Sequence, residues 1–231
     1  MSVKTRARVF TAAALVAGLS VAAPHSARAG TPACGPGCIG VFSDALGSYA
    51  QPKFIEHVFG GVAKIGTETG LHTASSSNTT EDFINPHQGN VDAYYKRGLV
   101  SASIAHQYGS LTASQLEYAP GGKRTGLCVG ISRSPFEGEA LSLQSCRTPG
   151  RTVWIIGTSL SPATAANHIF PIVSAATRDF SHPFAMSYPR HVDTSKALPP
   201  IRLRHLRFKG ASHAVPARQL WGVVIGPLPQ Q

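Results

Sequence analysis

The sequence has 231 residues and a formal net charge of +10, yet only 14% of its residues are charged, against roughly 25% in an average soluble domain. Its 23 glycines and 17 prolines interrupt the chain too often for a long-helix bundle or a coiled coil. The hydrophobic fraction of 42% supports a packed core and excludes a wholly disordered chain. Four cysteines are too few for a small disulfide-dense scaffold.

Residues 1–29 have the layout of a secretory signal peptide. A basic start and an uncharged apolar run over 10–23 precede the small-residue cleavage signal Ala27-Arg28-Ala29. The apolar run is shorter than the ~20 residues that span a bilayer. We therefore predict cleavage after Ala29 and a secreted, extracellular protein without stable membrane insertion.

Export permits disulfide bonds, because exported chains leave the reducing cytosol. The four cysteines, Cys34, Cys38, Cys128 and Cys146, allow three pairings. We predict the local pairing, Cys34 with Cys38 and Cys128 with Cys146, since Gly35-Pro36-Gly37 can fold the first pair into a tight turn. Closing the longer loop would add roughly 3 kcal/mol of stability in the chain-entropy model.

Short β-type runs between turn residues dominate the rest of the chain. Residues 91–105 have some helical character, but Gly98 and β-branched residues weaken it. The β-type runs that follow occupy 115–118, 127–131, 141–143 and 153–156. Many short strands separated by Gly and Pro are typical of an all-β sandwich or barrel.

A short polar stretch followed by an aromatic residue occurs three times at similar spacings. The three aromatic residues are Phe83, Trp154 and Trp221, and the leucines that lead the preceding strands are Leu71, Leu141 and Leu203. One such unit could not bury its own aromatic side chain, so three copies predict a pseudo-threefold fold with a shared core.

The stretch 116–156 resembles one repeat of the ricin-type β-trefoil lectin family. That family's repeat has a Cys-hydrophobic-Asp strand, a leucine-rich strand with a second cysteine, and a Gln-x-Trp motif. Cys128-Val129-Gly130 stands at the first motif, and Trp154 follows Cys146 at the family's spacing. The third unit keeps Gln219-Leu220-Trp221.

The first unit keeps only Phe54-Ile55-Glu56 and Glu81-Asp82-Phe83 of the family's repeat.

The whole chain also resembles exported proteins of high-GC Gram-positive bacteria, a similarity that implies no activity. The lectin resemblance implies an all-β fold, a β-trefoil of three unequal repeats with an inserted connection. We expect one domain over 30–231, with units at about 38–85, 114–157 and 168–227 and the connection over 86–113.

The resemblance also indicates where a sugar would bind. In the family, a carboxylate after the first cysteine accepts hydrogen bonds from sugar hydroxyls, an aromatic face on the next strand covers the sugar's C–H patch, and an Asn precedes Gln-x-Trp. The second unit has Gly130 and Arg151 at the carboxylate and Asn positions, and the third has Arg218 at the Asn position. The first unit retains three candidates, which are Glu56, His72 and Glu81. We predict that they line one shallow, solvent-facing carbohydrate site; the alternative is that the two glutamates are solvated surface groups.

The segment 202–209 carries the strongest charge feature. Its candidate anion-binding residues are Arg202, Arg204, Arg207 and Lys209. One interpretation of cations interleaved with apolar residues is an anion-binding strand, for acidic wall polymers, phosphate or nucleic acid. The alternative is a two-faced strand whose basic side is solvated.

The segment 126–130 has the spacing of a nucleophile elbow, with Cys128 in place of serine. Such a cysteine needs a lowered pKa and a nearby histidine, whereas export and Cys146 favour a disulfide. No histidine pair has the spacing of a helical zinc motif, and we expect no metal and no cofactor.

We therefore predict a secreted, non-catalytic, lectin-like protein that binds carbohydrate or cell-wall glycan. Two alternatives stay open: a secreted hydrolase with Cys128 as its nucleophile, and a trefoil protein that binds or inhibits other proteins. The expected partner is a glycan or an acidic cell-wall polymer, and we expect no nucleic acid.

Overall fold

The computed structural model describes residues 38–46, 54–75, 78–87, 89–188, 200–208 and 214–225. The predicted signal peptide, Cys34 and Lys209 lie outside these residues. The strands are β1 (Cys38–Ser43), β2 (Phe54–Val58), β3 (Thr69–Thr73), β4 (Phe83–Ile84), β5 (Gly89–Asn90), β6 (Thr112–Ser114), β7 (Glu117–Tyr118), β8 (Leu127–Gly130), β9 (Ser142–Ser145), β10 (Trp154–Ile156), β11 (Ile169–Phe170), β12 (Ile172–Ser174), β13 (Phe184–Ser187), β14 (Arg202–His205) and β15 (Trp221–Ile225). The α-helices are α1 (Val91–Lys96), α2 (Ala102–Tyr108) and α3 (Pro162–Ala165).

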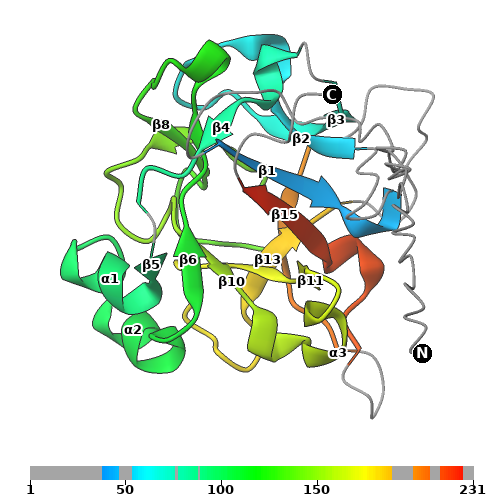
Figure 1. The fold of residues 1–231 in the computed structure, drawn as a ribbon. Helices are drawn as coiled ribbons and strands as arrows, with labels where there is room; N and C mark the ends of the chain where they lie inside the picture. The colour runs from blue at the N-terminus through cyan, green and yellow to red at the C-terminus, as the bar shows by residue number, and fades with distance from the viewer. Residues whose placement is uncertain are drawn as a thin grey trace, which may run out of the picture.

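Antiparallel pairings close the strands into a barrel (Figure 1). β1 pairs with β4 and β15, β4 with β7, β6 with β10, β10 with β12, and β11 with β15. Only Gln115 and Leu116 separate β6 from β7, and only Pro171 separates β11 from β12, so each of these pairs continues one strand. The circle of pairings therefore returns to β1 and leaves the barrel without an open edge.

Three hairpins, β2–β3, β8–β9 and β13–β14, form a triplet against this barrel. A ring of backbone hydrogen bonds joins them. Thr69 N donates to Leu141 O at 3.0 Å, Leu141 N to Ile201 O at 2.9 Å, and Ile201 N to Thr69 O at 3.1 Å. A closed barrel with three hairpins around a pseudo-threefold axis is a β-trefoil, which confirms the predicted fold class.

The three recurring aromatic residues lie in the shared core. Phe83, Trp154 and Trp221 are at most 1% exposed and belong to one hydrophobic cluster. Trp154 Nε1 donates to Val129 O at 2.9 Å, and Trp221 Nε1 donates to Met186 O at 3.0 Å. Each indole thus ties the last strand of its unit to the first strand of its hairpin.

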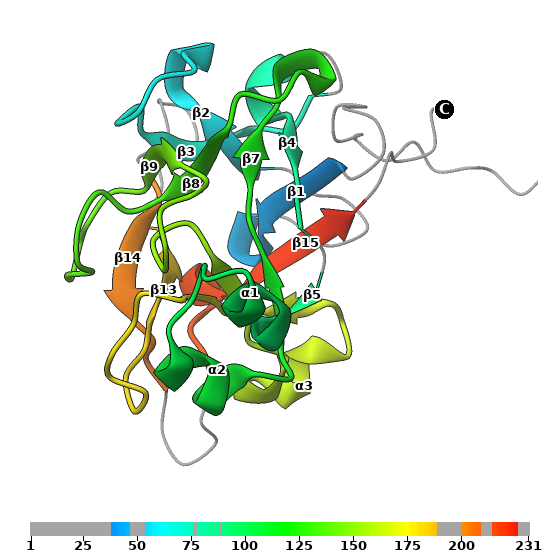
Figure 2. The same cartoon turned by 90° about the vertical axis from the view of Figure 1, so that its left-hand side faces the viewer.

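The inserted connection carries β5 and the two helices α1 and α2, which Figure 2 shows beside the barrel. Asn90 caps α1 and Ser101 caps α2 through their side-chain oxygens. Gly98, with φ of 71°, lies between the helices, so the expected helical stretch is broken in two. Both helices pack with the outer face of β10 in a second hydrophobic cluster. No helix in the described ranges is both long and apolar enough to cross a membrane.

The predicted bond between Cys128 and Cys146 is confirmed, with the two Cα atoms 4.9 Å apart. When the hairpins are matched position by position, Ile55 and Ala74 replace the pair in the first unit, and Ala185 and Leu206 replace it in the third. These substitutes are apolar and join the second hydrophobic cluster. The pairing of Cys38 with Cys34 stays a prediction, because Cys34 is outside the described residues.

Replacing both Cys128 and Cys146 by alanine should lower the free energy of unfolding by roughly 3 kcal/mol, because the 18-residue separation leaves a sizeable loop unconstrained in the unfolded chain. Denaturant unfolding of the double variant checks this, with Arg147→Ala as an exposed neighbouring control. Equal stability of the double variant and the wild type would contradict the expectation.

Candidate functional site

The hairpin registers show which residues of the three units are equivalent. Leu71 lies opposite Glu56, Leu143 opposite Val129, and Leu203 opposite Met186. Glu56 therefore occupies the position that the other units fill with the apolar core residues Val129 and Met186. The first unit therefore has a carboxyl side chain at a core position where the second and third units have apolar side chains.

Glu56 is fully buried. Its Oε1 accepts a hydrogen bond from Thr69 Oγ1 at 3.0 Å, and its Oε2 has no hydrogen-bond partner among the described residues. Burial raises the pKa of Glu56 to about 8, although the Thr69 hydroxyl opposes the rise. The carboxyl is therefore mostly neutral at pH 7.

The predicted solvent-facing role of Glu56 is wrong, and so is the alternative of a solvated surface group. The reason is a register difference of one residue. The family's carboxylate position, Gly130 in the second unit, lies opposite Ser142, and its first-unit counterpart is His57, opposite Gly70. Because side chains alternate along a strand, a shift of one residue turns Glu56 to the opposite face from His57.

His57 and His72 form the polar surface that the first unit does present. Their ring centroids are 5.0 Å apart, and His57 also meets the Phe59 ring edge-on at 5.0 Å. His57 is 8% exposed, whereas the His72 side chain is 53% exposed. Burial, and then the nearby His72, lower the pKa of His57 to about 4, so His57 is neutral at pH 7. His72 Nδ1 donates to Thr73 O at 2.9 Å, which fixes its ring.

Glu81 lies beneath His72, with Oε1 3.7 Å from His72 Nδ1 and no side-chain exposure. Ser75 N donates to Oε2 at 3.2 Å, and Asn78 Nδ2 donates to Oε1 at 3.1 Å. Burial raises the pKa of Glu81 to about 7 against these hydrogen bonds. The structure thus brings His72 and Glu81 together as predicted, but Glu81 supports the surface from below and does not face solvent.

The third unit explains why Glu81 is buried. Gln219 holds the equivalent place before the core aromatic, where its Oε1 accepts from Arg207 N at 3.1 Å and its Nε2 donates to His205 O at 2.9 Å. Glu81 accepts from Ser75 N in the same way. The glutamate therefore performs the structural task of the glutamine in Gln-x-Trp and ties the hairpin to the last strand.

The basic strand β14 has partners that its sequence does not reveal. Glu137 Oε1 lies 3.1 Å from Arg204 Nη1 and 3.8 Å from Arg207 Nη2. Arg202 Nη1 donates to Gly138 O at 2.7 Å. Glu137 offsets part of the positive charge, and anion binding by this strand, including Lys209 outside the described residues, stays a prediction.

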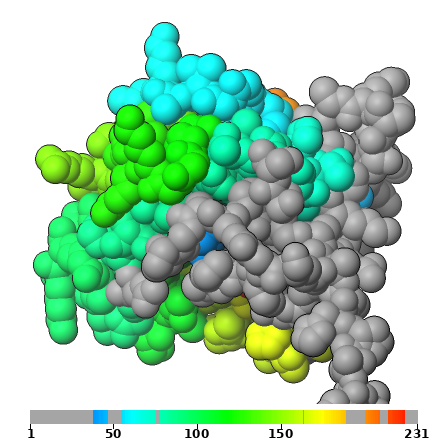
Figure 3. Space-filling model, turned by 45° about the horizontal axis from the view of Figure 1, so that its top comes forward, coloured from blue at the N-terminus to red at the C-terminus, as the bar shows by residue number. Residues whose placement is uncertain are grey.

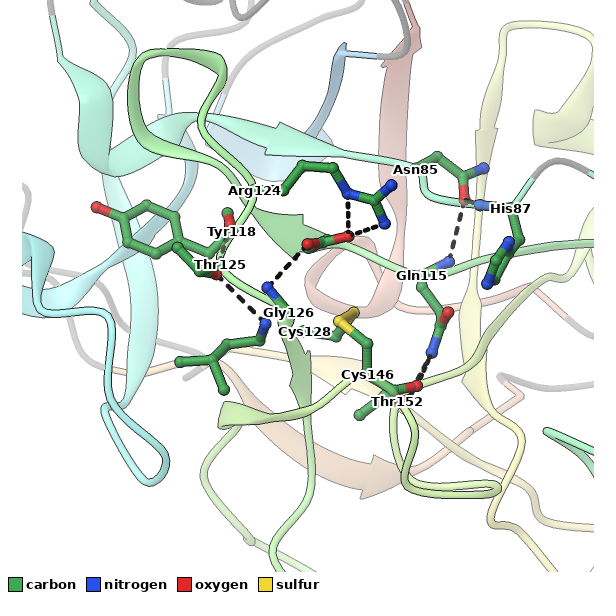
Figure 4. A network of polar contacts seen from close by, with 12 residues as sticks. Asn85, His87, Gln115, Tyr118, Arg124, Thr125, Gly126, Cys128, Cys146 and Thr152 are labelled. Carbon is green, nitrogen blue, oxygen red and sulfur yellow. Dashed lines mark hydrogen bonds and ion pairs between the residues drawn. A yellow bond between two sulfur atoms is a disulfide. The ribbon is translucent and has the colours of Figure 1, made fainter.

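Cys128 is fully buried and disulfide-bonded, so it has no free thiol and the hydrolase interpretation built on it fails. Figure 4 shows the polar network around this disulfide. Glu117, which no sequence pattern marks as structural, is 1% exposed, pairs with Arg124 at 2.6 Å and accepts from Gly126 N at 2.9 Å. Gln115 Nε2 donates to Cys146 O at 2.6 Å. These contacts fix the chain on both sides of the bond.

Within the described ranges, no three His, Cys, Asp or Glu side chains lie close enough together to hold a metal ion.

Comparison with known proteins was made by sequence and by structure. No protein-family model matches the sequence, and no curated protein matches it either. Among solved structures, a designed 3-fold symmetric protein, ThreeFoil, matches with a TM-score of 0.48 and 10% identity, over 81% of this chain and 98% of its own. A ricin B-like lectin of Macrolepiota procera, in complex with lactose, matches with a TM-score of 0.47 and 14% identity, over 81% of this chain and 95% of its own.

The strand pairings and the hairpin ring define the trefoil independently of these matches. The resemblance to exported proteins of high-GC Gram-positive bacteria stays a prediction.

Proposed function

We propose that the protein is a secreted, non-catalytic, lectin-like protein that binds a glycan on the first-unit surface formed by His57 and His72. The observation that carries the proposal is the exposed His72 ring, held by Thr73 O and packed beside His57, with Glu81 directly beneath it. His57 stands at the position where the lectin resemblance places a ligand-binding carboxylate, and His72 stands close to its aromatic position.

The chemistry of this surface suits a neutral sugar. A ring face covers the apolar C–H patch of a saccharide, and ring nitrogens exchange hydrogen bonds with its hydroxyls. The His72 ring is already fixed before a ligand arrives, so little side-chain freedom is lost on binding. Secretion is proposed on the basis of the signal-peptide layout of residues 1–29.

Changing His72 to alanine should weaken glycan retention roughly tenfold or more, because the variant loses both the ring face and a polar contact. The measurement is a glycan array probed with multivalent protein, since multivalency raises weak single-site affinities. His106→Ala, which removes an exposed histidine from α2, is the matched control and should bind like the wild type. Equal retention by all three proteins, or none by the wild type, would contradict the proposal.

Binding to another protein is a second candidate, favoured by two exposed apolar side chains. Val62 is 53% and Ile65 59% exposed on the β2–β3 connection. This part of the chain, in cyan, lies beside the green β7–β8 connection on the face shown in Figure 3, where Tyr118 Oη donates to Gly61 O at 3.2 Å. Purified proteases spotted beside the glycans separate the two candidates, because only this second function predicts retention on protein spots.

A further inference from the structure

A pocket of about 520 Å³ lies where the inserted segment meets the second and third units. Four stretches line it: 100–103 from the insertion, 133–135 from the β8–β9 connection, 149–151 before β10, and 175–178 after β12. Figure 2 shows α2, the β8–β9 connection and the yellow segment after β12 on the same side of the molecule. None of these stretches contributes to the first-unit surface.

Among the described residues, three arginines, Arg133, Arg151 and Arg178, line the pocket, and no acidic residue does. None of the three pairs with a carboxylate in the part of the chain that the structure describes, in contrast to Arg124 and Arg204. Asp179, next to Arg178 in the chain, lies 3.4 Å from His182 instead. The pocket thus concentrates positive charge that no carboxylate of the described ranges compensates. Hydroxyl groups also line its walls, from Ser101, Ser103, Ser134 and Thr177, although the Thr177 hydroxyl already donates to Asp179 O at 3.3 Å.

Several contacts fix the walls in place. Arg151 Nη1 donates to Ser132 O at 2.8 Å, and the Arg133 guanidinium lies 4.5 Å from the centre of the Phe136 ring. Gly150 N donates to Leu99 O at 2.7 Å and so ties the insertion to the second unit. A site whose cations are positioned in advance loses less conformational freedom when it binds.

We propose that this pocket binds an oxyanion, a phosphate or sulfate group carried by a small ligand. Guanidinium groups present planar pairs of donors that match the oxygens of such groups. The three arginines come from stretches far apart in the sequence and line one pocket, whereas Arg204 and Arg207 share Glu137. The inference does not depend on glycan binding, because the two sites share no residue.

The test titrates the protein with inorganic phosphate, inorganic sulfate, and a sulfated disaccharide beside its unsulfated form, at constant ionic strength. Binding is followed by the amide resonances of Ser103 and Thr177. We expect saturable shifts with anions and none with the unsulfated sugar. Binding should be weaker when the same titration is repeated at a higher ionic strength. The double variant Arg133→Ala/Arg178→Ala should bind roughly tenfold or more weakly, as expected for the loss of charge-assisted hydrogen bonds.

Arg147→Ala is the control for a general loss of positive charge and should bind like the wild type. Unchanged melting of the double variant shows that the fold persists. Non-saturable shifts, shifts confined to β14, or equal weakening in the control and the double variant would overturn the proposal. Preference among the three anions identifies whether phosphate or sulfate is the better ligand.

Discussion

Between pH 5 and pH 9, the Glu56 carboxyl is expected to remove roughly 4 kcal/mol from the free energy of unfolding. Its pKa is about 8 in the folded protein, above its ordinary value near 4.5. An acid whose pKa is raised by folding holds its proton more tightly in the folded state. Its favourable contribution is therefore complete below pH 4.5 and is lost as the pH rises towards 8. Above pH 8 the folded protein must bury a carboxylate with one hydroxyl partner.

Denaturant unfolding of the wild type and Glu56→Gln across this pH range provides the measurement. The difference between the two proteins isolates Glu56, because contributions from Glu81 and from His57 are common to both. Glu56→Met, which introduces the residue that the third unit has at Met186, should stabilise the protein at pH 9. Parallel pH profiles for the wild type and Glu56→Gln would contradict the raised pKa of a buried Glu56 carboxyl.

Replacing Trp154 by alanine is expected to cost about 3–5 kcal/mol of stability, the range for deleting a large buried aromatic side chain. Trp154 is 1% exposed, packs in the shared core and donates from Nε1 to Val129 O. The measurement is denaturant unfolding, with loss of a cooperative transition as the extreme result.

Trp154→Phe is the informative companion variant, because Phe83 fills the equivalent position of the first unit. It should fold and cost about 1–3 kcal/mol, since the ring is smaller and Val129 O loses its indole donor. A cost for Trp154→Ala no greater than that of an exposed substitution would show that the aromatic residues are not the common core of the units.

The trefoil could be predicted because its core positions are periodic in sequence. Phe83, Trp154 and Trp221 recur at similar spacings, and all three are buried in one cluster. The bond between Cys128 and Cys146 was predictable for a related reason, since Cys128 lies on β8, Cys146 directly follows β9, and the pairing of these two strands brings the cysteines together. The spacing of residues along the chain is therefore enough to predict the core aromatic positions and this disulfide.

The role of Glu56 could not be read from the sequence, because the first unit lacks the cysteine that marks the register. Ile55 stands where the second unit has Cys128, and without that marker an alignment one residue away looks equally acceptable. On a strand, that single residue exchanges a buried side chain for one on the other face. His57 was missed by the same error.

Charge partners were hidden for a different reason: tertiary contacts join residues far apart in the chain. The cations of the segment 202–209 stand out because they are close together in the sequence, yet Glu137 from another unit pairs with Arg204 and Arg207. Arg133, Arg151 and Arg178 form no pattern in the sequence, yet they line one pocket.

Chemical-shift mapping with a neutral glycan retained on the array tests the proposed lectin function most directly. We expect saturable changes at the amides of His57, His72 and Thr73, and the loss of these changes in His72→Ala. Changes confined to 175–178 or to β14, with His72 unaffected, would contradict a glycan site on the first unit.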